Sequence, residues 1–229
     1  MDDIIQNIKE DVYILLKEDK SGHDIEHINR VLDKSIKYAN IYKCDVFKTS
    51  LIALLHDVDD YKLVNSSTNE FLNARKIIRK YSIEIEEEII KSISEIGFNK
   101  RLDGIIPSTL ETKIVSDCDM LDSLGAIGLI RTIQFSNSKN IKTFDRSLFP
   151  RVIKNSIDYK KQNNQTTINH FFEKLLKIKD LILLDKIKNE ANDRYLFLIS
   201  FLKEYFKELE DKKWLDYLND YLNKGAKWF

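Results

Sequence analysis

Glycine and proline, the residues that most often interrupt helices, are scarce in this sequence: 229 residues contain six Gly and two Pro. Long stretches can therefore run as helix without a break in the backbone. Ile, Lys and Leu are the most frequent residues of the chain, and all three are compatible with helix. We therefore predict an all-α fold.

Apolar residues recur at spacings of three and four along most of the chain, a pattern typical of helices with one buried face. The stretch from Leu51 to Leu55 is continuously apolar, which predicts a helix at the centre of the core. We expect one domain over residues 1–229, with a helical tail from about 145 to 229 folded back on it. The predicted helices cover residues 2–19, 24–41, 45–58, 67–81, 84–97, 110–135, 145–160, 167–183, 186–210 and 211–223. Loops are predicted over 98–109 and 136–144.

Charge and hydropathy exclude several classes of protein. Lys plus Arg and Asp plus Glu both number 37, so the basic excess of a nucleic-acid-binding protein is missing. No run of about 18 apolar residues occurs, which argues against a membrane span. The acidic, amphipathic N-terminus is unlike a secretion signal, and two isolated cysteines make no disulfide framework. We therefore expect a cytoplasmic protein without nucleic-acid or membrane partners.

Only four histidines occur, and one of them lies at the end of the most apolar predicted helix, in the string ALLHDVDDYK. His56 and Asp57 form an ionisable pair at the edge of a core helix, where burial is costly unless the groups are paired, hydrogen-bonded or bound to metal. A role at the helix end alone is the simpler alternative, but the C-terminal end of a helix disfavours Asp. This pair predicts a metal site.

Two further segments carry candidate ligands. His27, in GHDIEHINRV, lies at the border of a predicted buried helix face. Asp117, Asp119 and Asp122 interrupt an otherwise apolar helix in IVSDCDMLDSLGAIG, where buried carboxylates need a cation. Asp119 and Asp122 share a helix face, and the spacing alone leaves open which carboxylate meets a metal. Two imidazoles with carboxylates suit Mn²⁺, Mg²⁺, Co²⁺, Fe²⁺ or Zn²⁺, and the shortage of further histidines favours a single ion.

In this order, His27, His56-Asp57 and Asp119 resemble the H…HD…D signature of the HD-domain superfamily of metal-dependent phosphohydrolases. The resemblance extends over about residues 22–210 to a bacterial branch of nucleotide phosphohydrolases and pyrophosphohydrolases, through the string from Asp117 to Gly128 and the late segment INHFFEKLLKIKDL. It implies a compact multi-helix HD-domain fold with a metal core over about 22–135, and His27, His56, Asp57 and Asp119 as ligands. Mn²⁺ is the preferred ion.

The reaction that this resemblance implies needs a group to orient water and cations to hold phosphate. We predict Asp60 as the catalytic carboxylate, although a solvated turn residue is an equal alternative. Lys62, Arg131 and Lys174 are predicted to bind the substrate phosphates, and each is also compatible with an ordinary surface or ion-pair role.

The predicted function is hydrolysis of nucleoside triphosphates to the monophosphate and pyrophosphate. The alternatives are a nucleotide phosphomonoesterase or phosphodiesterase on the same centre, a non-catalytic nucleotide-binding module, and a helical interaction protein with incidental histidines. The expected partner is a small phosphorylated substrate, and the chain is expected to be a monomer or homodimer.

Overall fold

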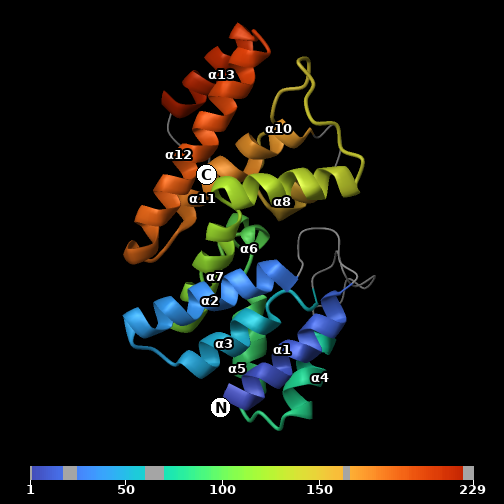
Figure 1. Cartoon of the computed structure of the whole chain (residues 1–229), viewed down its shortest axis with the longest axis vertical. Helices are drawn as coiled ribbons and strands as arrows, with labels where there is room; N and C mark the ends of the chain where they lie inside the picture. The colour runs from blue at the N-terminus through green and yellow to red at the C-terminus, as the bar shows by residue number, and fades with distance from the viewer. Residues whose placement is uncertain (1, 18–24, 60–69, 162–165, 224–229) are drawn as a thin grey trace. The chain divides into compact units, whose positions relative to one another are not determined.

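The structure, a computed structural model, describes residues 2–17, 25–59, 70–161 and 166–223. All regular structure in these ranges is helical, which confirms the all-α prediction (Figure 1). The chain divides into two compact units, Met1–Asp119 and Met120–Phe229. The organisation as a single domain stays a prediction.

The first unit contains seven helices within the described residues. They are α1 (Asp2–Leu16), α2 (Ile25–Tyr42), α3 (Val46–Leu55), α4 (Leu72–Lys80), α5 (Glu86–Ser94), α6 (Phe98–Leu102) and α7 (Leu110–Asp122), whose last turn crosses into the second unit. Helix α3 packs against α1, α2 and α5 (Figure 1). Every residue of α3 from Thr49 to Leu55 is buried, as its continuous apolar sequence predicts.

Helix ends in this unit follow local chemistry. Asp45 precedes α3, and its carboxylate accepts a hydrogen bond from the Lys48 backbone N–H at 2.9 Å. Such a cap satisfies one of the donors that a helix leaves open at its N-terminus. Three glutamates, Glu86, Glu87 and Glu88, open α5 and complement the positive end of its dipole.

The second unit is built on α8 (Gly125–Ser138) and the 24-residue α12 (Asp185–Glu208), which pack against each other. The shorter elements are α9 (Ser156–Lys160), α10 (Thr167–His170), a π-helix (Phe171–Leu175), α11 (Leu176–Ile178), a 3₁₀ turn (Lys179–Leu181) and α13 (Lys212–Asn223). Trp214 of α13 is fully buried, with the ring of Phe149 stacked on it at a centroid distance of 4.6 Å. The indole N–H of Trp214 donates to the carbonyl of Arg146, so its polar atom is satisfied as well.

Three sequence predictions were wrong in detail. The predicted loop over 98–109 contains the short helix α6, and most of the predicted helix over 145–160 is irregular except for α9. The single helix predicted over 110–135 is two helices, which break at residues 123–124. Gly125 there has φ +71°, a left-handed conformation that side chains disfavour. The chain thus ends one helix and begins another where a single helix was predicted.

The candidate metal centre

His56 lies at the C-terminal cap of α3, and its ring is oriented by the helix itself. The Nδ1 atom lies 2.8 Å from the backbone carbonyl of Ala53. A carbonyl only accepts, so Nδ1 carries the proton and donates, which leaves the lone pair on Nε2. Hydrogen bonding of one ring nitrogen to a backbone carbonyl is the usual arrangement of a histidine that binds metal through the other.

His27, on α2, is fully buried and faces the same point. The centroids of the His27 and His56 rings are 5.5 Å apart, with the planes inclined at 65°. Because α2 packs against α3, the two imidazoles meet although 29 positions separate them in the sequence. The predicted meeting of these two histidines is therefore found in the structure.

Two carboxylates approach the imidazoles. Oδ2 of Asp57 lies 3.3 Å from Nε2 of His27 and 3.5 Å from Nε2 of His56. Oδ1 of Asp119, on α7, lies 3.5 Å and 3.9 Å from the same two nitrogens. The side chains of Asp57 and Asp119 are 12% and 20% exposed, so both carboxylates are largely buried but keep some contact with solvent.

These separations fit atoms that surround one ion. Donors held about 2.1 Å from a tetrahedral metal lie about 3.4 Å from one another. The ligand atoms of His27, His56 and Asp57 all lie within 4.8 Å of each other, and Nε2 of His56 is buried without a hydrogen-bond partner in the described part of the chain. A buried ring nitrogen that makes no hydrogen bond is costly unless another group occupies its lone pair. The residues present therefore fit a divalent cation with mixed nitrogen and oxygen ligands.

The three aspartates of α7 have different surroundings. Only Asp119 faces the imidazoles at the distances given above. Asp117 is 1% exposed, and its charge opposes the lowering of the Arg101 pKa that burial causes. Asp122 accepts a hydrogen bond from the Arg131 guanidinium at 2.9 Å. The geometry thus favours Asp119 as the third segment's ligand, although Asp119 and Asp122 share a helix face in the sequence pattern.

The predicted catalytic and phosphate-binding residues lie partly outside the described residues and partly in the second unit. Asp60 and Lys62 lie outside the described residues. Arg131 lies on α8 and is held by Asp122, with its side chain 15% exposed. Lys174 lies in the π-helical turn of the second unit, beside Glu173, whose buried carboxylate is bound by Arg151. Phosphate binding by these three cations stays a prediction.

Sequence reasoning missed the residues that support the candidate ligands. Asp59 accepts hydrogen bonds from the backbone of α4, and Arg194 of α12 donates to the carbonyl of Leu121 in the last turn of α7 at 2.8 Å. The second aspartate of HDVDD was a visible signal for Asp59. Arg194 has no comparable signal, because it lies 73 positions from its partner in an ordinary amphipathic helix.

Comparison with known proteins defines the class. Residues 24–124 match the family model of the HD domain, a segment that begins before His27 and ends after Asp119. The chain therefore carries an HD domain over these residues, and its solved structural neighbours include a protein described as an HD-superfamily hydrolase, a class whose members at a general level are metal-dependent phosphohydrolases. No described helix has the length and apolar character that crossing a membrane requires.

Three relatives cover nearly the whole chain. The uncharacterised protein YpgQ of Bacillus subtilis is 28% identical over 210 residues, which are 89% of this chain and 93% of YpgQ. Its crystal structure in complex with ADP superposes with a TM-score of 0.68, at 25% identity, over 89% of this chain and 97% of that one. A Lactobacillus plantarum protein gives a TM-score of 0.80 at 27% identity (92% and 98% covered). An HD-superfamily hydrolase from Bacillus thuringiensis gives 0.67 at 29% identity (91% and 97% covered).

Proposed function

We propose that this protein hydrolyses nucleoside triphosphates to the monophosphate and pyrophosphate at a single divalent ion held by His27, His56, Asp57 and Asp119. The observation that carries the proposal is that one carboxylate oxygen of Asp57 and one of Asp119 each lie 3.3 to 3.9 Å from the ring nitrogens of both His27 and His56. The binding of ADP to the relative YpgQ supports a nucleotide as substrate.

The proposed ligands divide the chemistry among them. His27 and His56 supply neutral nitrogen donors, and Asp57 and Asp119 offset the charge of the cation. A divalent ion bound there, Mn²⁺ in our preferred assignment, supplies a Lewis acid that polarises a phosphoryl oxygen and lowers the pKa of water. Because both carboxylates are largely buried, little water screens these electrostatic effects.

Hydrolysis also needs a proton acceptor near the attacking water. In the proposed reaction the water oxygen bonds to the α-phosphorus while the bond from that phosphorus to the pyrophosphate oxygen breaks, and one water proton passes to a carboxylate. Both oxygens of Asp59 accept backbone hydrogen bonds, so its neighbour Asp60 is the better candidate for this role. Asp60 is assigned from the sequence.

Cations are proposed to hold the phosphate chain. Lys62 follows the metal-binding pair in the sequence, and Lys174 and Arg131 belong to the second unit. The ion pair with Asp122 fixes the orientation of the Arg131 guanidinium, whose several donors suit recognition of phosphate. Each of these three residues remains part of the proposal.

Metal analysis followed by product analysis tests the proposal. The purified protein is stripped with chelator, reloaded with Mn²⁺ and given nucleoside triphosphates, and pyrophosphate and phosphate are quantified separately. We expect pyrophosphate and monophosphate in equal amounts, and a rate at least about 1,000-fold lower in His56→Ala, which loses the ion. His170→Ala, which changes a histidine of the second unit, is the matched control and should keep the ion.

The other outcomes separate the alternatives. Release of phosphate alone from monophosphates, or opening of a cyclic nucleotide, indicates the phosphomonoesterase or phosphodiesterase. Nucleotide binding without turnover indicates the non-catalytic module. A wild-type protein that binds no divalent ion would contradict the proposal entirely.

A further inference from the structure

The turn that carries His56 and Asp57 is tied to a helix that begins 13 residues later. Asp59 lies in this turn, two positions after Asp57. One oxygen of its carboxylate accepts a hydrogen bond from the backbone N–H of Asn73, and the other accepts one from that of Ala74, both at 2.9 Å. In return, the side-chain amide of Asn73 donates to the backbone carbonyl of Val58 at 3.0 Å.

This connection replaces a missing cap. The first N–H groups of a helix have no partner within it, and a side chain just before the helix usually accepts from them. At α4 that position is Phe71, which has φ 50° and offers no side-chain acceptor. Asp59 performs the task from 14 and 15 positions away, and its negative charge also complements the helix dipole.

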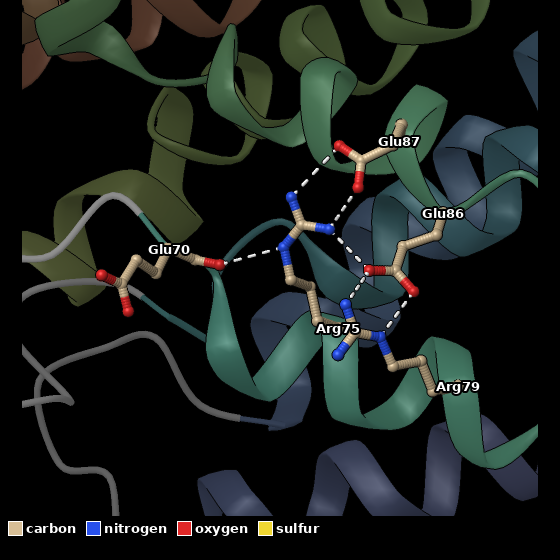
Figure 2. Close-up of polar contacts among 5 residues, drawn as sticks. All are labelled: Glu70, Arg75, Arg79, Glu86 and Glu87. Atoms are coloured by element: carbon tan, nitrogen blue, oxygen red, sulfur yellow. Dashed lines mark hydrogen bonds and ion pairs between the residues drawn. The ribbon is translucent and has the colours of Figure 1, made fainter.

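Helix α4 is itself anchored by buried side chains and ion pairs, so it can fix the position of the turn that carries His56 and Asp57. Ala74, Ile77 and Ile78 are buried. Figure 2 shows Arg75 and Arg79 of α4 reaching the carboxylates at the start of α5. The guanidinium of Arg79 binds both oxygens of Glu86, at 2.8 and 2.7 Å, and Arg75 contacts Glu86 and Glu87.

We propose that Asp59 is a positioning residue, which sets the geometry of His56 and Asp57 by fixing their turn to the N-terminus of α4. Both of its oxygens accept from backbone N–H groups, so it acts on the metal through the turn rather than as a ligand. The inference rests on the proposed metal site. It also gives the two consecutive aspartates of HDVDD different roles: Asp59 positions the turn, and Asp60 remains the candidate proton acceptor.

The test measures Mn²⁺ affinity by calorimetry and, separately, thermal unfolding of the metal-free protein. Residues that orient metal ligands typically change affinity by about 10- to 100-fold when replaced, so we expect Asp59→Ala to weaken Mn²⁺ binding by about that factor. Asp59→Asn keeps one acceptor and should fall between wild type and Asp59→Ala. The stoichiometry should stay at one ion per chain in both variants.

Asp45→Ala is the matched control. It also removes one negative charge and the cap of one helix in the same unit, but at the start of α3, eleven positions before His56. It should lower the unfolding temperature and leave Mn²⁺ affinity unchanged. If Asp59→Ala unfolds earlier but binds Mn²⁺ like wild type, Asp59 is only a helix cap and the inference is overturned.

A milder variant covers the possibility that Asp59→Ala fails to fold. Asn73→Ala removes the bond to the Val58 carbonyl and leaves the Asp59 carboxylate in place, and we expect about 2- to 5-fold weaker Mn²⁺ binding. Unchanged affinity in this variant argues against the link. Failure of wild type to bind Mn²⁺ at all would instead reject the proposed function, so the two failures are distinguishable.

Discussion

The two segments that bring carboxylates to the candidate metal centre are held by charges of opposite sign. The turn with Asp57 is fixed by an anion, Asp59, at the N-terminus of α4. The last turn of α7, which follows Asp119, is fixed by cations: Arg194 binds the carbonyl of Leu121, and Arg131 binds the carboxylate of Asp122.

Each arrangement matches the helix end that it meets, because a helix exposes N–H groups and positive potential at its start, and carbonyl groups and negative potential at its end. Asp59 on one side and Arg194 and Arg131 on the other therefore need no sequence pattern in common. What they have in common is that a charged side chain binds a helix end of complementary charge and thereby fixes the neighbouring residues.

The largest expected effect comes from the break between α7 and α8 at residues 123–124. A Cβ added at Gly128 would lie 2.1 Å from the backbone oxygen of Ser123, a contact that only backbone movement can relieve. Gly128→Ala should therefore lower the free energy of unfolding by about 3 kcal/mol, measured by urea denaturation. Ala126→Ser, on an exposed position of the same helix, should change it by less than about 0.5 kcal/mol. A loss below about 1 kcal/mol for Gly128→Ala would show that the junction adapts.

Replacement of the carboxylates tests whether both segments serve the same ion. Asp57→Asn and Asp119→Asn should each weaken Mn²⁺ binding by at least about 100-fold, since a ligand should matter more than its supports. The matched control is Asp122→Asn, which alters a buried carboxylate of the same helix that pairs with Arg131. It should cost stability yet keep Mn²⁺ affinity within about 10-fold of wild type. Equal losses in Asp119→Asn and Asp122→Asn would contradict the assignment of Asp119.

The cationic support is tested by Arg194→Met, which keeps most of the side-chain volume. We expect a loss of about 1–2 kcal/mol in the free energy of unfolding, because a charged donor to the Leu121 carbonyl disappears. Arg146→Met is the comparison variant: Arg146 donates to the carbonyl of Leu209 at the end of α12, but its side chain is 63% exposed. Solvent screening should make that loss smaller. A similar loss in both variants would mean that burial adds nothing at Arg194.

The smallest effect concerns the network that fixes α4 (Figure 2). Hydrogen bonds from Arg79 and then Arg75 lower the pKa of Glu86 from 4.5 to about 2. A lowered folded-state pKa stabilises the protein above pH 4.5, and this contribution is lost as pH falls toward 2. Glu86→Gln should thus unfold at a slightly lower temperature than wild type at pH 7, with the difference shrinking below pH 4.5. A difference that stays constant down to pH 3 would show that the charge of Glu86 is not its source.

Much of the helical layout was predictable, and the errors have local causes. The buried face of α3 follows from its unbroken apolar run, and α12 and α13 agree with the prediction within two residues at each end. The sequence did not predict the full break between α7 and α8, because glycines within a helical pattern often serve only to let helices pack closely. Here Gly125 adopts positive φ, and Gly128 has no room for a side chain.

The sequence by itself determined the all-α class and the small set of candidate ligand residues. Helix periodicity and the few histidines can both be read from the sequence without knowing the fold. Only the tertiary structure decided which of three aspartates meets the imidazoles, and which side chains hold that geometry. Those answers depend on distances between segments up to 92 positions apart, from His27 to Asp119. Such distances are set by the packing of whole helices, which no single segment encodes.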